Sequence, residues 1–330
     1  MRLEINRTEG LSNDLLLRLD GGEIETSLLG LSSRSRLMEL PGMPRHRETS
    51  AEEARCIEAC KNTLGDRLRA LGIVDEDGKA RRRAIAVSNC NLGANQGHVA
   101  WQRSESPRIF RIQEDPCGFP SYSCLVQWRA GGLSIEDLRF DFAADRVYQS
   151  ADGRDLSDEL EWATFGQRVL RDGSIARMEE IADRFYDIRH VLAFDHRRAS
   201  GDRARLAIYE GYPERFRENV LRAWRECGLS RSRYFHNAIG VSRDELIVVQ
   251  REGTVEEIAA VLLQAGAQDG IILDNGGSVA CWVWWANAYA GGLISPTVDY
   301  RAPGTSAIAF ILKGPLRPEL PGGSVSYSTY

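Results

Sequence analysis

Lysine is nearly missing from this 330-residue chain, although the chain is rich in basic residues. Of its 42 basic residues only Lys61, Lys79 and Lys313 are lysines, and the other 39 are arginines. A GC-rich coding bias explains such an excess. An arginine surface for phosphate is the alternative, because guanidinium groups bind phosphate in a bidentate way. The net charge of −5 excludes a general affinity for nucleic acid, and the basic cluster at 79–83 has no interleaved aromatic residues.

Long apolar runs are also missing. No run is long enough to span a membrane, and the first six residues contain no apolar signal core. The seven cysteines are odd in number and form no C-x-x-C pair, which is typical of reduced thiols. We therefore expect a cytoplasmic protein without a membrane partner.

Cofactor signatures are absent too. The chain has neither a G-x-G-x-x-G motif at a strand–helix junction nor a Walker A loop. Cys56 and Cys60 lie one helical turn apart, but no third and fourth zinc ligand stand near them. We expect no cofactor and no resident metal, although a divalent ion could accompany a bound phosphate. The sequence does not specify the oligomeric state.

The pattern of apolar residues predicts an α/β (α+β) protein with a mixed, strand-rich sheet core and flanking helices. Capping boxes at Ser50/Glu53 and Thr254/Glu257 predict helices that end before Gly72 and Gly266. Other helices are expected over 176–186 and 214–227. Short apolar runs bounded by Gly, Asp and Pro predict the strands, which are expected at 84–87, 108–112, 124–128, 138–142, 147–149, 164–171, 190–194, 205–209, 238–241, 246–249, 270–273, from 279, and 307–312.

The most informative stretch is the run from Gly270 to Ser278. An apolar strand ends at Leu273 and is followed by Asp274, Asn275 and two glycines. Glycines let the backbone adopt positive φ and bring bare N–H groups close to a ligand. A turn-forming Asp is the bland interpretation of Asp274. In the functional interpretation, Asp274 is a carboxylate beside a concavity lined by N–H groups, and such a site suits chemistry on a sugar or a phosphate ester.

The C-terminal third resembles the phosphodiester glycosidase family, in order and spacing, over residues 234–314. The matching segments are Phe235–Gly240, a hairpin over 241–250, the helix at 254–265, Leu273–Ser278, and Tyr300-Arg301. The match is weaker from about residue 84, where Phe165–Gly173 and Asn89 alone echo the family. The resemblance implies a fold like that of the phosphodiester glycosidases and an enzyme acting on a phosphorylated or glycosylated small molecule.

Three positions depart from the family pattern. His236 stands where the family has Arg, Asn275 replaces the first Gly of the glycine triplet, and Val279 replaces a Ser. A titratable ring in place of a permanent cation favours proton transfer over fixed charge. Asn275 tolerates left-handed φ, so we expect the turn to persist.

The resemblance implies roles for individual residues. Asp274, His236 and Arg301 are the expected catalytic residues, with Asp274 and His236 moving protons and Arg301 holding a phosphate. Each also has a bland interpretation, as a turn residue, a core histidine and a solvated arginine. The expected substrate-binding residues are Asn275, Gly276, Gly277, Ser278, Asn237, Asn89 and Thr305.

Three segments are expected: a helical N-terminal extension over 1–80, the phosphodiester-glycosidase-like domain over 81–314, and a flexible tail over 315–330. The leading hypothesis is a hydrolase that cleaves a glycosidic C–O bond of a sugar phosphate or nucleotide-like small molecule by acid/base catalysis, with bacterial specialised metabolism as one setting. A repurposed lyase, cyclase or transferase is the second hypothesis, and a non-catalytic module that binds a phosphorylated ligand is the third.

Overall fold

The structure is a computed structural model of the chain, and its described residues form a sheet-dominated, mixed α+β arrangement with few helices. No helix in the parts it describes is long and apolar enough to cross a membrane. The description covers residues 2–7, 13–20, 24–29, 68–77, 81–89, 98–104, 109–112, 121–184, 214–226, 228–275, 279, 281–284, 292–293, 306–313 and 326–329.

The chain divides into two compact units, each built from segments far apart in sequence. The first unit comprises Met1–Asn91, Tyr234–Glu252 and Leu273–Tyr330, and the second comprises Leu92–Arg233 and Gly253–Ile272. This division differs from the expected one, in which 81–314 formed one continuous domain. The chain leaves the first unit and returns to it twice, and sequence order does not reveal such a return.

One sheet of the first unit contains the hairpin and the strand on which the predicted site depends. Of the eight strands of this sheet, those with residues in the first unit run in the order β15, β13, β14, β2, β1, β19, with β1 and β19 parallel and β2 antiparallel to both of its neighbours. Their bounds are β1 Arg2–Arg7, β2 Asn13–Asp20, β13 Tyr234–Val241, β14 Glu245–Gly253, β15 Asp269–Asn275 and β19 Ser326–Thr329.

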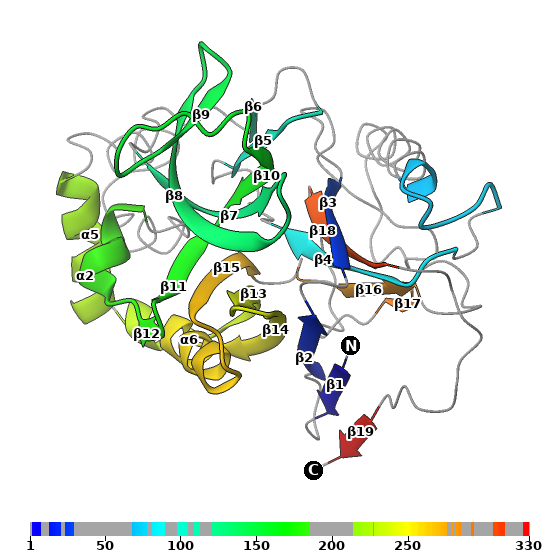
Figure 1. The fold of residues 1–330 in the computed structure, drawn as a ribbon. Coiled ribbons are helices and arrows are strands. Elements are labelled where there is room, and N and C mark those ends of the chain that lie inside the picture. The colour runs from blue at the N-terminus through cyan, green and yellow to red at the C-terminus, as the bar shows by residue number, and fades with distance from the viewer. Residues whose placement is uncertain are drawn as a thin grey trace, which may run out of the picture. The chain divides into compact units, whose positions relative to one another are not determined.

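A second, five-stranded sheet of the first unit has the order β17, β16, β4, β18, β3 (Figure 1). Strand β18 is buried from Ala307 to Leu312 and pairs antiparallel with the central strand β4 and with β3. Strand β13 of the other sheet contacts β4. The bounds are β3 Ile24–Leu29, β4 Ala84–Asn89, β16 Cys281–Trp284, β17 Gly292–Leu293 and β18 Ser306–Leu312.

The terminal segments differ from the expected helical extension and flexible tail. Within 1–80 the described residues form β1, β2, β3 and a single helical turn at 68–70, and within 315–330 they form β19. Leu17 and Leu19 of β2 are fully buried. The period-two pattern of this strand is obscured in sequence by the consecutive leucines Leu15 to Leu17, and its partner β14 lies more than 200 residues away. Most of the helix predicted from Ser50 lies outside the described residues.

The second unit is built around a six-stranded antiparallel sheet with the order β6, β5, β10, β7, β8, β9. Tyr122 lies at its core, with its ring edge-on to Phe140 and to Phe165 at 5.4 Å in each case. Strand β5 was not predicted. The bounds are β5 His98–Gln102, β6 Ile109–Ile112, β7 Tyr122–Trp128, β8 Leu133–Asp141, β9 Arg146–Gln149 and β10 Leu160–Phe165.

A hairpin closed by Asp172-Gly173 follows this sheet, as the sequence predicts. Strand β11 (Gln167–Arg171) pairs with β12 (Ser174–Ile175), and φ is 50° at Asp172 and 70° at Gly173. Two consecutive residues with positive φ are what a two-residue hairpin loop of type I′ requires. The predicted strand over 164–171 is interrupted at Gly166, where β10 ends and β11 begins.

The described helices α2, α5 and α6 lie in the second unit, and α6 (Val255–Gln264) packs against β11 and β12. Its predicted capping box is confirmed, because Thr254 Oγ1 accepts the Glu257 N–H while the Glu257 carboxylate accepts the Thr254 N–H. Gly266 follows the helix with φ 95°. The helix expected over 176–186 is shorter. The remaining helical bounds are α2 Met178–Ile181, the 3-10 turns η1 Ala182–Arg184 and η2 Leu229–Arg231, and α5 Glu214–Glu226.

Two glycines of the second unit provide a matched test of the packing on β15. A Cβ added at Gly166 would lie 2.6 Å from the backbone oxygen of Ile272, whereas one at Gly270 would meet the side-chain tip of Leu262 at 2.9 Å. A backbone atom cannot move aside as a side-chain tip can. We expect Gly166→Ala to lower the free energy of unfolding by about 3 kcal/mol and Gly270→Ala by about 1 kcal/mol. Urea titration of both variants measures this, and equal losses would contradict it.

Candidate active site

The hairpin of β13 and β14 and the adjacent β15 hold four of the predicted site residues, His236, Asn237, Asp274 and Asn275. Strands β15, β13 and β14 are neighbours in one sheet. The predicted hairpin over 238–249 is confirmed, and it turns through Ser242, whose N–H donates to the Glu245 carbonyl at 2.9 Å. His236 and Asn237 therefore lie on one strand of the sheet, and Asp274 and Asn275 lie on the neighbouring strand.

Buried polar side chains gather on these three strands. Among the described residues of the first unit, every polar or charged side chain that is buried lies on β13, β14 or β15, and the set is His236, Asn237, Gln250, Asp274 and Asn275. Burying a polar group is costly unless a partner compensates it, and burying a carboxylate costs more still. Such a concentration within apolar strands is therefore an unusual feature of the fold.

Asp274 is fully buried near the end of β15. Its Oδ1 accepts a hydrogen bond from the N–H of the next residue, Asn275, at 2.8 Å. The strand was expected to end at Leu273, with Asp274 at the mouth of a turn, but it continues through Asn275. Asn275 is not among the described residues with positive φ, and the turn that was expected to persist after it, at 276–278, lies outside the described residues. A buried, hydrogen-bonded carboxylate has a fixed position, which suits a group that must meet a reacting atom.

Asn237 and Gln250 form a buried cross-strand pair. The Nε2 of Gln250 donates to Oδ1 of Asn237 at 3.0 Å, and neither side chain is exposed. Gln250 was missed in the sequence analysis. The signal was present, because Gln250 is the polar residue at the end of the apolar run Leu246–Val249. This bond shows that Asn237 and Gln250 lie on the same face of the sheet.

His236 lies on the other face of β13. Successive side chains of a strand point to opposite faces, so His236 and Asn237 cannot share one. The His236 ring is 1% exposed and meets the ring of Tyr234 edge-on at 6.3 Å between centroids. The same alternation separates Asp274 from Asn275. The expected binding and catalytic residues therefore divide between two faces of the sheet.

The remaining predicted residues are only partly within the described structure. Asn89 ends β4 and pairs with Ser306 of β18. The predicted residues outside the described part of the chain are Gly276, Gly277, Ser278, Arg301 and Thr305. Within the described ranges no three His, Cys, Asp or Glu side chains gather as a metal ion would need.

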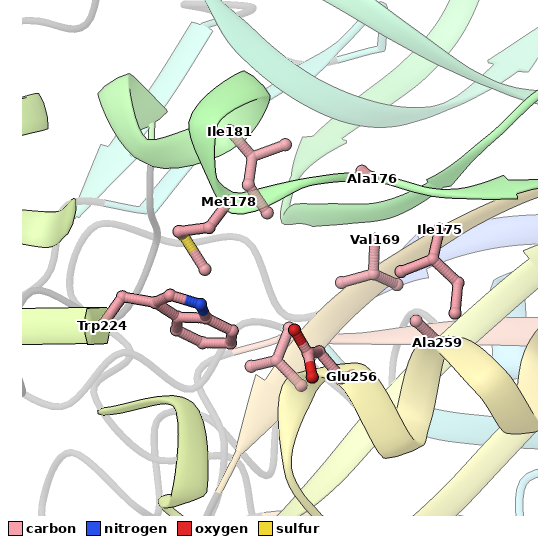
Figure 2. A pocket seen from close by; sticks show the side chains of 9 residues that line it. Val169, Ile175, Ala176, Met178, Ile181, Trp224, Glu256 and Ala259 are labelled. Atoms are coloured by element: carbon pink, nitrogen blue, oxygen red, sulfur yellow. The ribbon is translucent and has the colours of Figure 1, made fainter. Parts of the chain in front are cut away.

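A small, partly open pocket in the second unit has a different character (Figure 2). Trp224, Met178 and Ile181 form one part of its wall, and Val169 and Ile175 form another. Glu256 is the one charged residue among those lining it. No predicted site residue lines this pocket. An apolar wall with a single carboxylate offers no cation for a phosphate, so it does not suit the predicted substrates.

No protein-family profile matches this chain, and no curated protein does. Among solved structures, the chain is similar to the catalytic domain of zebrafish N-acetylglucosamine-1-phosphodiester alpha-N-acetylglucosaminidase, which is described as auto-inhibited by its pro-peptide. The TM-score is 0.46 at 11% identity, over 92% of this chain and 78% of that one. A protein from Burkholderia pseudomallei K96243 gives a TM-score of 0.40 at 12% identity, over 91% and 74%. A hypothetical protein from Synechocystis gives 0.34 at 12% identity, over 94% of this chain and 61% of that chain. These are distant likenesses of fold, and no argument about activity depends on them.

Proposed function

We propose that this chain is an enzyme that cleaves the anomeric C–O bond of a phosphorylated sugar or nucleotide-like small molecule by acid/base catalysis. The observation that carries the proposal is the gathering of buried polar side chains on three neighbouring strands, with Asp274 among them. Polar groups in a water-excluded site act more strongly on a reacting centre than they would in water, because the local dielectric is low.

The chemistry assigns a role to each residue. One group protonates the leaving phosphate oxygen while the C1–O bond breaks, and the other takes a proton from the water that forms the new bond to C1. A pair of groups in opposite protonation states is the usual need of glycoside cleavage. Asp274 and His236 are the proposed pair, which requires Asp274 to share the face of His236. The Gly276–Ser278 turn and Arg301 are proposed to hold the phosphate.

A panel of anomeric phosphate esters tests the proposal. UDP-N-acetylglucosamine, UDP-glucose and N-acetylglucosamine 1-phosphate, each incubated with the protein, should include a substrate that yields free sugar plus its phosphate or nucleotide. Product analysis by NMR in H₂¹⁸O should place ¹⁸O on the sugar, because the C1–O bond is the one that breaks. Label on the phosphate would contradict C–O cleavage.

The same panel separates the alternatives. A product formed without uptake of water would favour a lyase, cyclase or transferase over a hydrolase. Binding of an ester by calorimetry with no product after long incubation would favour a non-catalytic phospho-ligand module. Either outcome would overturn hydrolysis. A small-molecule partner and a cytoplasmic setting belong to the same proposal.

A further inference from the structure

We infer that the Asn237–Gln250 hydrogen bond sets the register of the β13–β14 hairpin and so keeps His236 on its face of the sheet. Asn237 and Gln250 are then positioning residues that act through His236. This role for Asn237 replaces the substrate contact expected from sequence. The inference rests on the proposed function only where it invokes turnover.

Register needs such a device because both strands are buried on both faces. On β14 every residue from Leu246 to Gln250 is buried, and on β13 every residue from Phe235 to Gly240 is buried. Alternation of apolar and polar residues normally specifies register, because a slip of one residue exposes the apolar set. Here all of these residues are buried, polar and apolar alike, so a slip of one residue would not expose the apolar set. The apolar pattern of this hairpin therefore leaves its register weakly specified.

The amide pair supplies the missing specificity. Gln250 Nε2 donates to Asn237 Oδ1 in the observed register, where the two side chains face each other across the strands, and a slipped strand would separate the buried amide groups. The turn at Ser242–Glu245 fixes the register at one end of the hairpin. The pair lies toward the other end, next to His236 in the chain. A buried polar pair that selects one register over another has a precedent in the single polar core positions of coiled coils.

The register of the hairpin decides on which face of the sheet the His236 ring lies. Because neighbouring side chains point to opposite faces, a slip or bulge of one residue near Asn237 would move the His236 ring away from its face. Asn237 already commits its Oδ1 to Gln250. The pair should therefore influence the proton-transfer step and leave substrate affinity nearly unchanged.

The test replaces both partners together. Asn237→Leu/Gln250→Met removes both members of this hydrogen bond together, so neither amide of the pair is left without the other and the protein should stay folded. We expect kcat on the substrate identified above to fall about 10- to 100-fold, because small misplacements of a catalytic group have effects of this size. KM should change less than about 3-fold. The pH–rate limb that His236→Gln removes should also shift or broaden.

Exchanging the two side chains between the strands should restore the activity lost in the double variant. Asn237→Gln/Gln250→Asn rebuilds a cross-strand amide bond of the same total length, and it should recover most of kcat. A raised KM with unchanged kcat in the double variant would show that Asn237 contacts substrate, and would overturn the inference. If the swapped variant is stably folded but its kcat stays low, the inference is also overturned.

A readout without substrate keeps this inference separate from the proposed function. The chain has only five histidines, so the ring signals can be assigned by single replacements in ¹H–¹³C spectra. We expect one His236 signal in the unmodified protein, several or a displaced one in the double variant, and one again in the swap. A single unmoved signal in all three would overturn the inference. Failure of every ester in the panel would instead reject the proposed function, and these spectra would still decide the role of the pair.

Discussion

Asp274→Asn should lower kcat by about 10²- to 10⁴-fold on any anomeric ester that the protein cleaves, which is the range of a lost general acid or base. Asn has the same shape as Asp but neither carries the charge nor transfers the proton. Its Oδ1 can still accept the N–H of Asn275, the bond that Asp274 makes in the structure. The fold should therefore be retained. Steady-state kinetics, with circular dichroism and urea unfolding on the same sample, measure both effects.

The matched control is Asp244→Asn. Asp244 is an exposed residue of the turn between β13 and β14, so the control makes the same chemical change in the same unit, outside the buried strands. Its kcat should stay within about 2-fold of the unmodified protein, because surface substitutions rarely disturb a buried site. Turnover that survives in Asp274→Asn, or falls equally in both variants, would reject the assignment of Asp274.

The free energy of unfolding adds a second expectation for Asp274→Asn. A neutral amide is less costly to bury than a carboxylate. The variant should therefore be at least as stable as the unmodified protein while its turnover falls. Activity lost together with stability would instead mean that Asp274 serves the fold.

Much of the secondary structure could be predicted from local signals in the sequence. The capping box at Thr254 and Glu257, and the Asp172-Gly173 turn, each rest on residues within four positions of one another, and both predictions are confirmed. The strands β6, β9 and β18 were similarly marked by their own apolar runs. Such features could be predicted because the interactions that define them lie within one segment.

Long-range pairing could not be predicted in the same way. Strand β2 is completed by β14, and β19 by β1, across more than 200 residues in each case. Nothing near Asn13–Asp20 or Ser326–Thr329 specifies these partners. The same limit applies to the candidate site. Asp274 and His236 were found through their motifs, but the division of the site residues between two faces follows from strand alternation and from the bond to Gln250.

No sequence motif marks Arg168, yet the structure buries its guanidinium among several hydrogen-bonding partners. It lies on β11 in the second unit and is only 6% exposed. Its Nη1 lies 3.1 Å from Asp269 Oδ1, and its Nη2 donates to the Ile135 carbonyl at 2.5 Å. Asp137 is 3.7 Å from the same guanidinium. One buried cation thus links β11 to β8 and to β15.

Arg168→Met should lower the free energy of unfolding by about 3–5 kcal/mol, the usual cost of removing one member of a buried ion pair. Met fills similar volume, so the loss reflects carboxylates and a carbonyl left without their cation. Arg171→Met is the matched control. Arg171 contacts Asp137 at 2.6 Å, but its side chain is 44% exposed, so its loss should cost less than about 1 kcal/mol. Urea unfolding of both variants gives the comparison, and equal losses would contradict a buried role for Arg168.

The loss in free energy of unfolding caused by Arg168→Met should also depend on pH. Burial raises the pKa of the Asp269 carboxyl, and the charge of Arg168 is the largest influence that lowers it. Removing Arg168 raises that pKa further. A carboxyl whose pKa is raised by folding destabilises the fold as pH rises through the folded pKa, and it regains neutrality below that value. The gap between Arg168→Met and the unmodified protein should therefore narrow at acidic pH and widen toward neutrality. In Arg168→Met/Asp269→Asn this dependence should shrink, because the group that titrates is gone. A gap that stays the same across this pH range would mean that lost packing, and not the stranded carboxylate, explains the destabilisation.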